Sequence, residues 1–355
     1  GRVELRDGEN EISVERGWGY YDVDYVELSP ASEPPRLRSM LPKLSDPKAT
    51  PETRRLYSDL LRLYGNRTLS GQYDEAESDF VRTTTGQTPA ILGGDFMDYS
   101  PSRQPYFDKP LKDAVPSWIE RVRKGQILTL SWHWNAPKDL IDRKEFKKPN
   151  GEVIDASWYR GFYTDATTFD VQKALADPAS EDYRLILRDI DAIAEPLKRL
   201  QAAKVPVLWR PLHEADGRWF WWGAKGAEPC KALWRLMYRR MTEHHGLHNL
   251  IWVWNSPSPD WFPGDDTVDV MSVDLYPGDR RDATSAAWEE QLARFDGRKP
   301  LALAEFPGAP DVERMRRFGV RWLYFVSWTG SVGPKATLPE VLKGTYDSKF
   351  VKNAR

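Results

Sequence analysis

Two glutamates, Glu214 and Glu305, come at the ends of two apolar runs, at 205–210 and 300–305, and lie inside apolar sequence, at 212–214 and 303–306. Most glutamates in a protein are solvated, but a carboxyl group inside apolar sequence is expected to be buried, and burial perturbs its pKa. Such a pair could cleave a glycosidic bond. One protonated carboxyl group would give a proton to the leaving oxygen, while the other, ionised, would attack the anomeric carbon or activate water.

Polar and aromatic side chains also close the other apolar runs of the chain. For any one of them, the simpler interpretation is that polarity resumes where a buried segment ends. A whole set at the ends of successive runs is instead typical of the floor of an active-site cleft. The set comprises Gln72, Asp95, His133, His213, Asn255, Asp274, Tyr276 and Trp328.

These runs alternate with helical patterns, and continuous apolar runs are typical of parallel strands buried on both faces. The pattern predicts an α/β fold, a (β/α)₈ TIM barrel, whose active site lies at the carboxyl ends of the strands. A doubly wound sheet is the alternative, but no glycine-rich phosphate loop follows the first run. The predicted strands are 68–71, 89–95, 127–134, 205–210, 250–255, 270–276, 300–305 and 322–328.

One helical pattern stands out, over 183–197, with apolar residues at three- and four-residue steps. Pro196 lies within it, which predicts a kink or an earlier end. Two further helices are predicted around 233–241 and 288–295.

Three segments divide the chain. Residues 1–28 are predicted to form a short N-terminal β segment, because 11–14 alternate between polar and apolar residues and 18–28 are aromatic and β-branched. Residues 29–39 form a proline-rich linker, and residues 40–355 form the catalytic domain. Because the chain starts without methionine or a signal-like apolar stretch, we expect a trimmed or mature form.

Composition narrows the choice of partners. The formal net charge of −2 gives no reason to expect nucleic acid or an anionic membrane, and no apolar run is long enough for a membrane span. The single cysteine, Cys230, excludes an internal disulfide or a multi-thiolate metal site. The 16 tryptophans would suit a cleft that stacks on sugar rings as well as a core.

Three histidines, His244, His245 and His248, cluster at a predicted helix end, where polar side chains suit the helix terminus. No carboxylate or cysteine falls at ligand spacing among them, so we predict no metal site and no cofactor.

The chain carries the string Trp209-Arg210-Pro211-Leu212-His213-Glu214, continuing through Gly217 to Trp219-Phe220-Trp221-Trp222-Gly223. This string, the most specific match in the chain, resembles the acid/base segment of glycoside hydrolase family 26, the β-mannanase family within the clan-A barrels. Shorter segments at 69–72, 131–135, 252–255, 274–276 and 327–328 also match, so the resemblance covers roughly residues 40–345. Residues 8–12 and 17–26 resemble the last strands of a family 35 or family 6 carbohydrate-binding module.

The resemblance implies a role for each candidate residue. Glu214 would be the acid/base and Glu305 the nucleophile. Tyr276 would donate a hydrogen bond to Glu305, and Asp274 would be a supporting partner. His213 and His133 would line the subsite of the attacked sugar, and Trp328 would form its floor. Trp219 would flank the cleavage point on the leaving-group side. From the residues alone, these histidines, Tyr276 and Asp274 could equally be structural.

The family implies a retaining endo-β-1,4-mannanase acting on mannan, glucomannan or galactomannan, and the aromatic set at 219–222 most resembles mannanases. The alternatives within the family are a mixed-linkage β-glucanase and a β-1,3-xylanase. A further alternative is a barrel that binds polysaccharide without cleaving it. We expect a monomer, and a secreted or cell-surface protein, since polymeric mannan cannot enter a cell.

Overall fold

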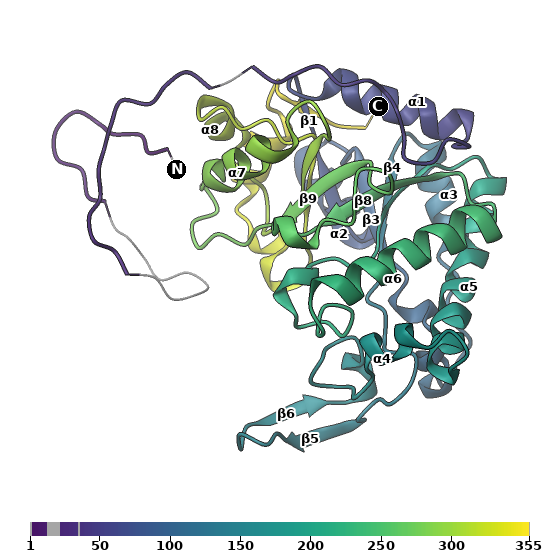
Figure 1. The fold of residues 1–355 in the computed structure, drawn as a ribbon. Coiled ribbons are helices and arrows are strands. Elements are labelled where there is room, and N and C mark those ends of the chain that lie inside the picture. Colours follow the sequence, from purple (N-terminus) through teal and green to yellow (C-terminus); the bar gives the residue numbers. More distant parts are fainter. Residues whose placement is uncertain (1, 13–21, 35, 355) are drawn as a thin grey trace.

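The computed structural model describes residues 2–12, 22–34 and 36–354. At its centre, eight parallel strands form a closed barrel in the order β10-β11-β2-β3-β4-β7-β8-β9 (Figure 1). The predicted (β/α)₈ barrel is therefore confirmed. The barrel strands are β2 (Gly71–Tyr73), β3 (Ile91–Asp95), β4 (Ile127–Ser131), β7 (Val207–Arg210), β8 (Leu250–Asn255), β9 (Val270–Asp274), β10 (Leu301–Phe306) and β11 (Phe325–Ser327).

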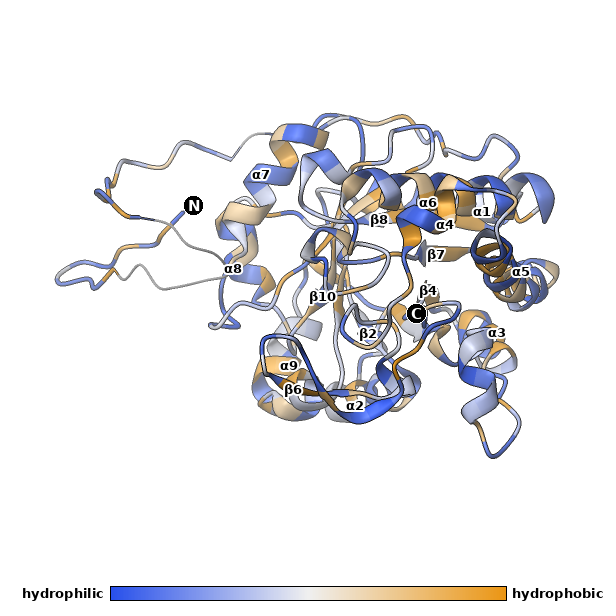
Figure 2. Cartoon of the chain, turned by 60° about the horizontal axis from the view of Figure 1, so that its bottom comes forward, coloured by the Kyte–Doolittle hydropathy of each residue, from blue (hydrophilic) through white to orange (hydrophobic). Residues whose placement is uncertain are grey.

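Helices surround the barrel, and their apolar sides face the strands while their polar sides face outward (Figure 2). This arrangement buries both faces of the sheet, which is why its strands are continuously apolar. The α-helices are α1 (Pro51–Leu63), α2 (Glu75–Thr85), α3 (Val115–Arg123), α4 (Val171–Ala176), α5 (Glu181–Ala202), α6 (Ala227–Arg239), α7 (Ser285–Phe295), α8 (Val312–Arg317) and α9 (Pro339–Tyr346).

Helix α5 continues through Pro196 to Ala202. The prediction of an earlier end was wrong, because the buried apolar face of this helix outweighs the one hydrogen bond that proline cannot donate. Helix α6 leads directly into a π-helical turn, η5 (Arg240–His244).

The predicted first strand divides between two sheets. β1 (Thr68–Leu69) pairs with β12 (Val351–Lys352) outside the barrel, and the barrel strand begins only at Gly71. A Cβ atom at Gly71 would lie 2.6 Å from the carbonyl oxygen of Phe325, so only glycine fits where the chain enters the barrel.

Most of the tryptophan surplus fills the core rather than a cleft. Trp219 is 43% exposed, and Trp158 and Trp328 are partly buried. The composition therefore says more about core packing than about sugar binding. The fully buried tryptophans are Trp132, Trp134, Trp209, Trp221, Trp222, Trp234, Trp252, Trp254, Trp288 and Trp322.

The N-terminal β segment is not seen in the described residues. Residues 2–12 and 22–28 contain no strand, and 13–21, which carry most of the aromatic pattern, lie outside the described residues. The start of the chain instead runs beside α7 and α8, where Arg2 pairs with Glu289 and Arg317 with Glu4 (Figure 1). None of the described helices is long and apolar enough to cross a membrane.

The connection after β4 is long and has its own structure. It contains an antiparallel hairpin, β5 (Arg143–Lys147) and β6 (Val153–Ala156), that projects away from the barrel (Figure 1). Its later part returns to the rim, where the amide of Trp221 donates to the carbonyl of Phe162 at 3.1 Å.

Candidate active site

Glu214 and Glu305 meet at the carboxyl end of the barrel, although 91 positions separate them in the chain (305 − 214). One carboxyl oxygen of each, with one of Asp274, lies within 4.8 Å of the others. Glu214, Trp219, Asn255 and Asp274 line a cleft of about 300 Å³. A larger hollow of about 570 Å³ lies between α8 and α9, but the smaller cleft is the one lined by two of the three clustered carboxyl groups, those of Glu214 and Asp274.

Glu214 sits on a tight turn just after β7. It adopts a left-handed conformation at φ 50°, ψ 34°, and Leu212 also has a positive φ of 51°. Such backbone is costly for residues other than glycine and is found where side chains must be aimed. The turn is held by the amide of Glu214, which donates to Oδ1 of Asn255 at 2.8 Å.

The Glu214 carboxyl group is arranged to hold a proton near neutral pH. Burial, with a contribution from the negative charge of Asp274, raises its pKa to about 7. The indole of Trp219 donates to its Oε2 at 2.9 Å. This indole lies over Gly217, where a Cβ atom would come within 2.1 Å of the ring, which explains the glycine in the motif.

Glu305 lies within β10 and has two hydrogen-bond donors. Arg210 donates to its Oε1, and the hydroxyl of Tyr276 donates to its Oε2 at 2.7 Å. Burial raises the pKa of Glu305, while the guanidinium of Arg210 opposes that rise. Burial and the charge of Glu305 raise the pKa of Tyr276, so the phenol keeps its proton and remains a donor.

Arg210 is a central residue to which the sequence analysis gave no role. Its buried guanidinium also donates to Oδ2 of Asp274 at 2.8 Å and to the hydroxyl of Tyr73 at 2.9 Å. Asp274 in turn accepts from Asn255 at 2.9 Å, and burial raises its pKa while the guanidinium of Arg210 opposes that rise. An arginine inside an apolar strand was the available signal, because a buried guanidinium requires carboxylate partners.

The two predicted histidines are in contact. Their Nε2 atoms are 3.2 Å apart, and the ring of His133 lies 6.0 Å from that of Trp328. Trp328 packs on Tyr73 at 4.9 Å, and its carbonyl accepts from the side chain of Gln72 at 2.9 Å. The structure therefore brings all the predicted site residues into one contact network.

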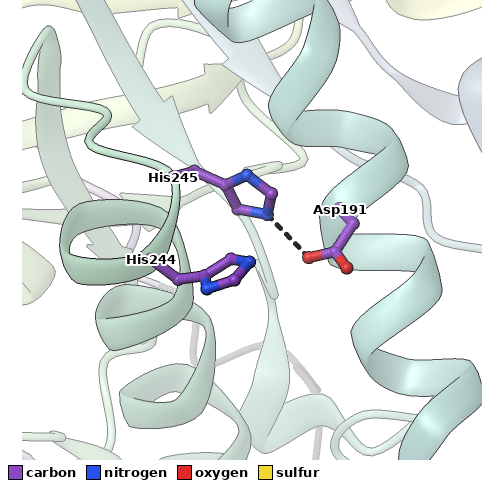
Figure 3. A group of neighbouring side chains, drawn as sticks. All are labelled: Asp191, His244 and His245. Atoms are coloured by element: carbon purple, nitrogen blue, oxygen red, sulfur yellow. Dashed lines mark hydrogen bonds and ion pairs between the residues drawn. The ribbon is translucent and has the colours of Figure 1, made fainter.

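His244 and His245, from the other histidine cluster, lie beside a carboxylate that the sequence did not indicate. Asp191 on α5 faces His244 and His245, and Nε2 of His245 lies 2.6 Å from its Oδ1 (Figure 3). Arg240 already donates to both oxygens of Asp191, each at 2.8 Å. Since this guanidinium would repel a cation, the cluster is best explained as a pairing between α5 and the π turn.

Two adjacent carboxyl groups at the carboxyl ends of the strands of a parallel barrel are typical of glycoside hydrolases. The chain is a member of glycosyl hydrolase family 26, whose sequence profile matches residues 45–354. The resemblance of residues 40–345 to this family is thus confirmed.

Named relatives support this assignment. A mannan endo-1,4-β-mannosidase of Thermothelomyces thermophilus is 44% identical over 353 residues, which are 99% of this chain and 70% of the relative. The crystal structure of a Podospora anserina GH26-CBM35 β-(1,4)-mannanase superposes with a TM-score of 0.81 at 41% identity, over 92% of this chain and 70% of that one. A β-mannanase from a symbiotic protist of the termite Reticulitermes speratus, complexed with gluco-manno-oligosaccharide, gives a TM-score of 0.74 at 30% identity, over 89% and 97%.

Proposed function

We propose that the protein is a retaining endo-β-1,4-mannanase in which Glu305 is the nucleophile and Glu214 the acid/base. The observation that carries the proposal is the close approach of their carboxyl oxygens, within 4.8 Å. Retaining glycosidases hold the two groups about 5–5.5 Å apart, whereas inverting enzymes need about 6.5–9.5 Å to admit water.

The hydrogen-bond partners divide the two roles. Glu305 accepts from a guanidinium and a phenol, which favours its ionised form for attack on the anomeric carbon. As that bond forms, the bond to the leaving oxygen breaks and Glu214 transfers its proton to that oxygen. Once Glu305 is bonded to the sugar it no longer carries a negative charge, and the pKa of Glu214 therefore falls. The resulting carboxylate takes a proton from water, which attacks the sugar and releases Glu305.

The remaining predicted residues support these steps. Tyr276 and Asp274, through Arg210, orient Glu305. We place the attacked sugar against His133, His213 and Trp328, and the leaving group beside the exposed Trp219.

Mannan is the proposed substrate because the relatives carry that activity in their names. A polymeric substrate that cannot enter cells supports secretion or a cell-surface location.

Turnover on a substrate panel tests this proposal. We expect turnover on mannan or glucomannan at least about tenfold above that on mixed-linkage β-glucan at equal mass, because sugars differing in one hydroxyl orientation can leave a buried partner unpaired. Proton NMR of the first product should show the β-anomer. Faster turnover of β-glucan would reassign the substrate, and an initial α-anomer would contradict retention.

The pH profile of kcat/KM on mannohexaose should be bell-shaped. Glu214 must be protonated for the first step, so activity should fall as the pH rises through about 7. Glu305 must be ionised, so activity should also fall as the pH drops through its pKa, which lies above the ordinary glutamate value. Activity that still rises between about pH 7 and 9 would exclude Glu214 as the proton donor.

A further inference from the structure

Asp95, at the end of β3, accepts hydrogen bonds from several directions. The amides of Met97 and His133 donate to its Oδ1 at 2.6 and 3.1 Å, and the hydroxyl of Ser131 donates to its Oδ2 at 2.9 Å. Nδ1 of His133 lies 2.6 Å from the same Oδ2. A carboxyl group surrounded by so many donors is stabilised as the anion, so Nδ1 of His133 carries a hydrogen.

The opposite nitrogen of His133 faces another ring nitrogen. Its Nε2 lies 3.2 Å from Nε2 of His213, and one hydrogen fits between them. His213 is buried, its ring lies 5.1 Å from Phe220, and its Nδ1 has no hydrogen-bond partner among the described residues. In the part of the chain that the structure describes, a carboxylate contacts the ring of His133 and none contacts the ring of His213, so a positive charge is stable on His133 and costly on His213.

We propose that Asp95 is a positioning residue that keeps His133 as an imidazolium, whose second N–H fixes His213, the residue directly before Glu214. This inference rests on the proposed function in taking Glu214 as the acid/base. Among the described residues, the contact with His133 is the one hydrogen bond that orients the ring of His213, because Nδ1 of His213 has no partner there. The chain of contacts thereby links the end of β3 to the turn that aims Glu214.

The surrounding charges agree with this assignment. Burial lowers the pKa of His133, but Asp95 and, less strongly, Glu305 outweigh it and leave that pKa above its ordinary value. Burial and the positive charges of His133 and Arg210 hold the pKa of His213 well below its ordinary value. The imidazolium in turn acts to lower the pKa of Glu214.

Histidine NMR tests the protonation directly. The chain has only five histidines, so ring ¹⁵N and ¹³C signals can be assigned by replacing each in turn. In the unmodified protein at pH 7, we expect His133 to be doubly protonated and His213 neutral with its hydrogen on Nδ1. In Asp95→Asn, His133 should be neutral at the same pH. A neutral His133 in the unmodified protein would overturn the proposal even if the variant failed to fold.

Kinetics test the positioning role. Asp95→Asn should lower kcat on mannohexaose by about 10- to 100-fold and move the alkaline limb of the pH profile upward, because Glu214 loses the nearby positive charge. A loss of folded protein alone would lower the rate without moving that limb. Asp108→Asn, a change at an exposed carboxylate, is the matched control.

An unmoved limb or an unchanged kcat in Asp95→Asn would overturn the positioning role. Failure of the proposed function is distinguishable from failure of this inference. An unmodified protein with an intact imidazolium and no hydrolysis of mannohexaose would support the protonation pattern and contradict the glycosidase assignment.

Discussion

Replacement of Glu305 by alanine is expected to lower kcat on mannan by on the order of 10⁴- to 10⁶-fold. The variant loses the carboxylate that we propose forms the covalent glycosyl-enzyme, and loss of a nucleophile has effects of this size in other enzymes. Initial rates measured at high enzyme concentration, together with a thermal melt, check the result. Arg210 keeps its contact with Asp274 in this variant, so the guanidinium is not left without an anion.

Two controls sharpen this experiment. Glu305→Gln keeps the shape of the side chain and should be about as inactive, which separates loss of charge from loss of packing. Glu313→Ala, on the exposed side of α8, should retain full activity. Azide should not convert Glu305→Ala into a producer of β-mannosyl azide, since attack from the vacated side would give the α-anomer. Formation of the β-azide would assign the nucleophile to another group.

The barrel could be predicted from the sequence because its signal is local. Strands buried on both faces need continuous apolar residues, and β8 matches the predicted run 250–255 at both ends. The first strand was less well predicted, because apolar sequence does not specify which neighbour a strand pairs with. Thr68 and Leu69 pair with residues near the C-terminus, a contact between distant segments that no local pattern encodes.

Candidate site residues were predictable where their own positions carried the signal, and their partners were not. Glu214 and Glu305 could be selected because each is a carboxylate inside apolar sequence. The guanidinium of Arg210 contacts Asp274 and Glu305 only once the barrel closes and brings the carboxyl ends of β7, β9 and β10 to the same rim. The positive φ of Glu214 was equally hidden, since it comes from the fit of the turn to Asn255 and not from an intrinsic preference of glutamate.

Tryptophan content illustrates how composition can mislead. An indole stacks on a sugar and packs in a core through the same flat apolar face, so a count of tryptophans cannot separate the two uses. The exposed fraction of each indole separates the two uses. Trp132 and Trp134 stack on each other at 4.1 Å in the interior, whereas Trp219 is 43% exposed and donates to Glu214.

Replacement of Glu214 by alanine should produce a loss that depends on the leaving group. On mannan, whose leaving alcohol needs a proton, we expect kcat/KM to fall by about 10²- to 10⁴-fold. On an aryl mannoside with an acidic phenol, the first step needs little protonation, so the glycosyl-enzyme should still form and then accumulate for want of a base. A burst of phenol followed by slow steady-state release, measured by stopped-flow absorbance, checks this expectation.

Azide distinguishes this residue from Glu305 by stereochemistry. It needs no general base, so it should restore turnover of the aryl substrate in Glu214→Ala and give β-mannosyl azide, the product of attack on the covalent intermediate. Glu228→Ala, at an exposed glutamate near the start of α6, should show neither the burst nor the azide effect. Equal losses on mannan and on the aryl mannoside would mean that Glu214 is not the proton donor, and its pKa of about 7 would then reflect burial without a role in proton transfer.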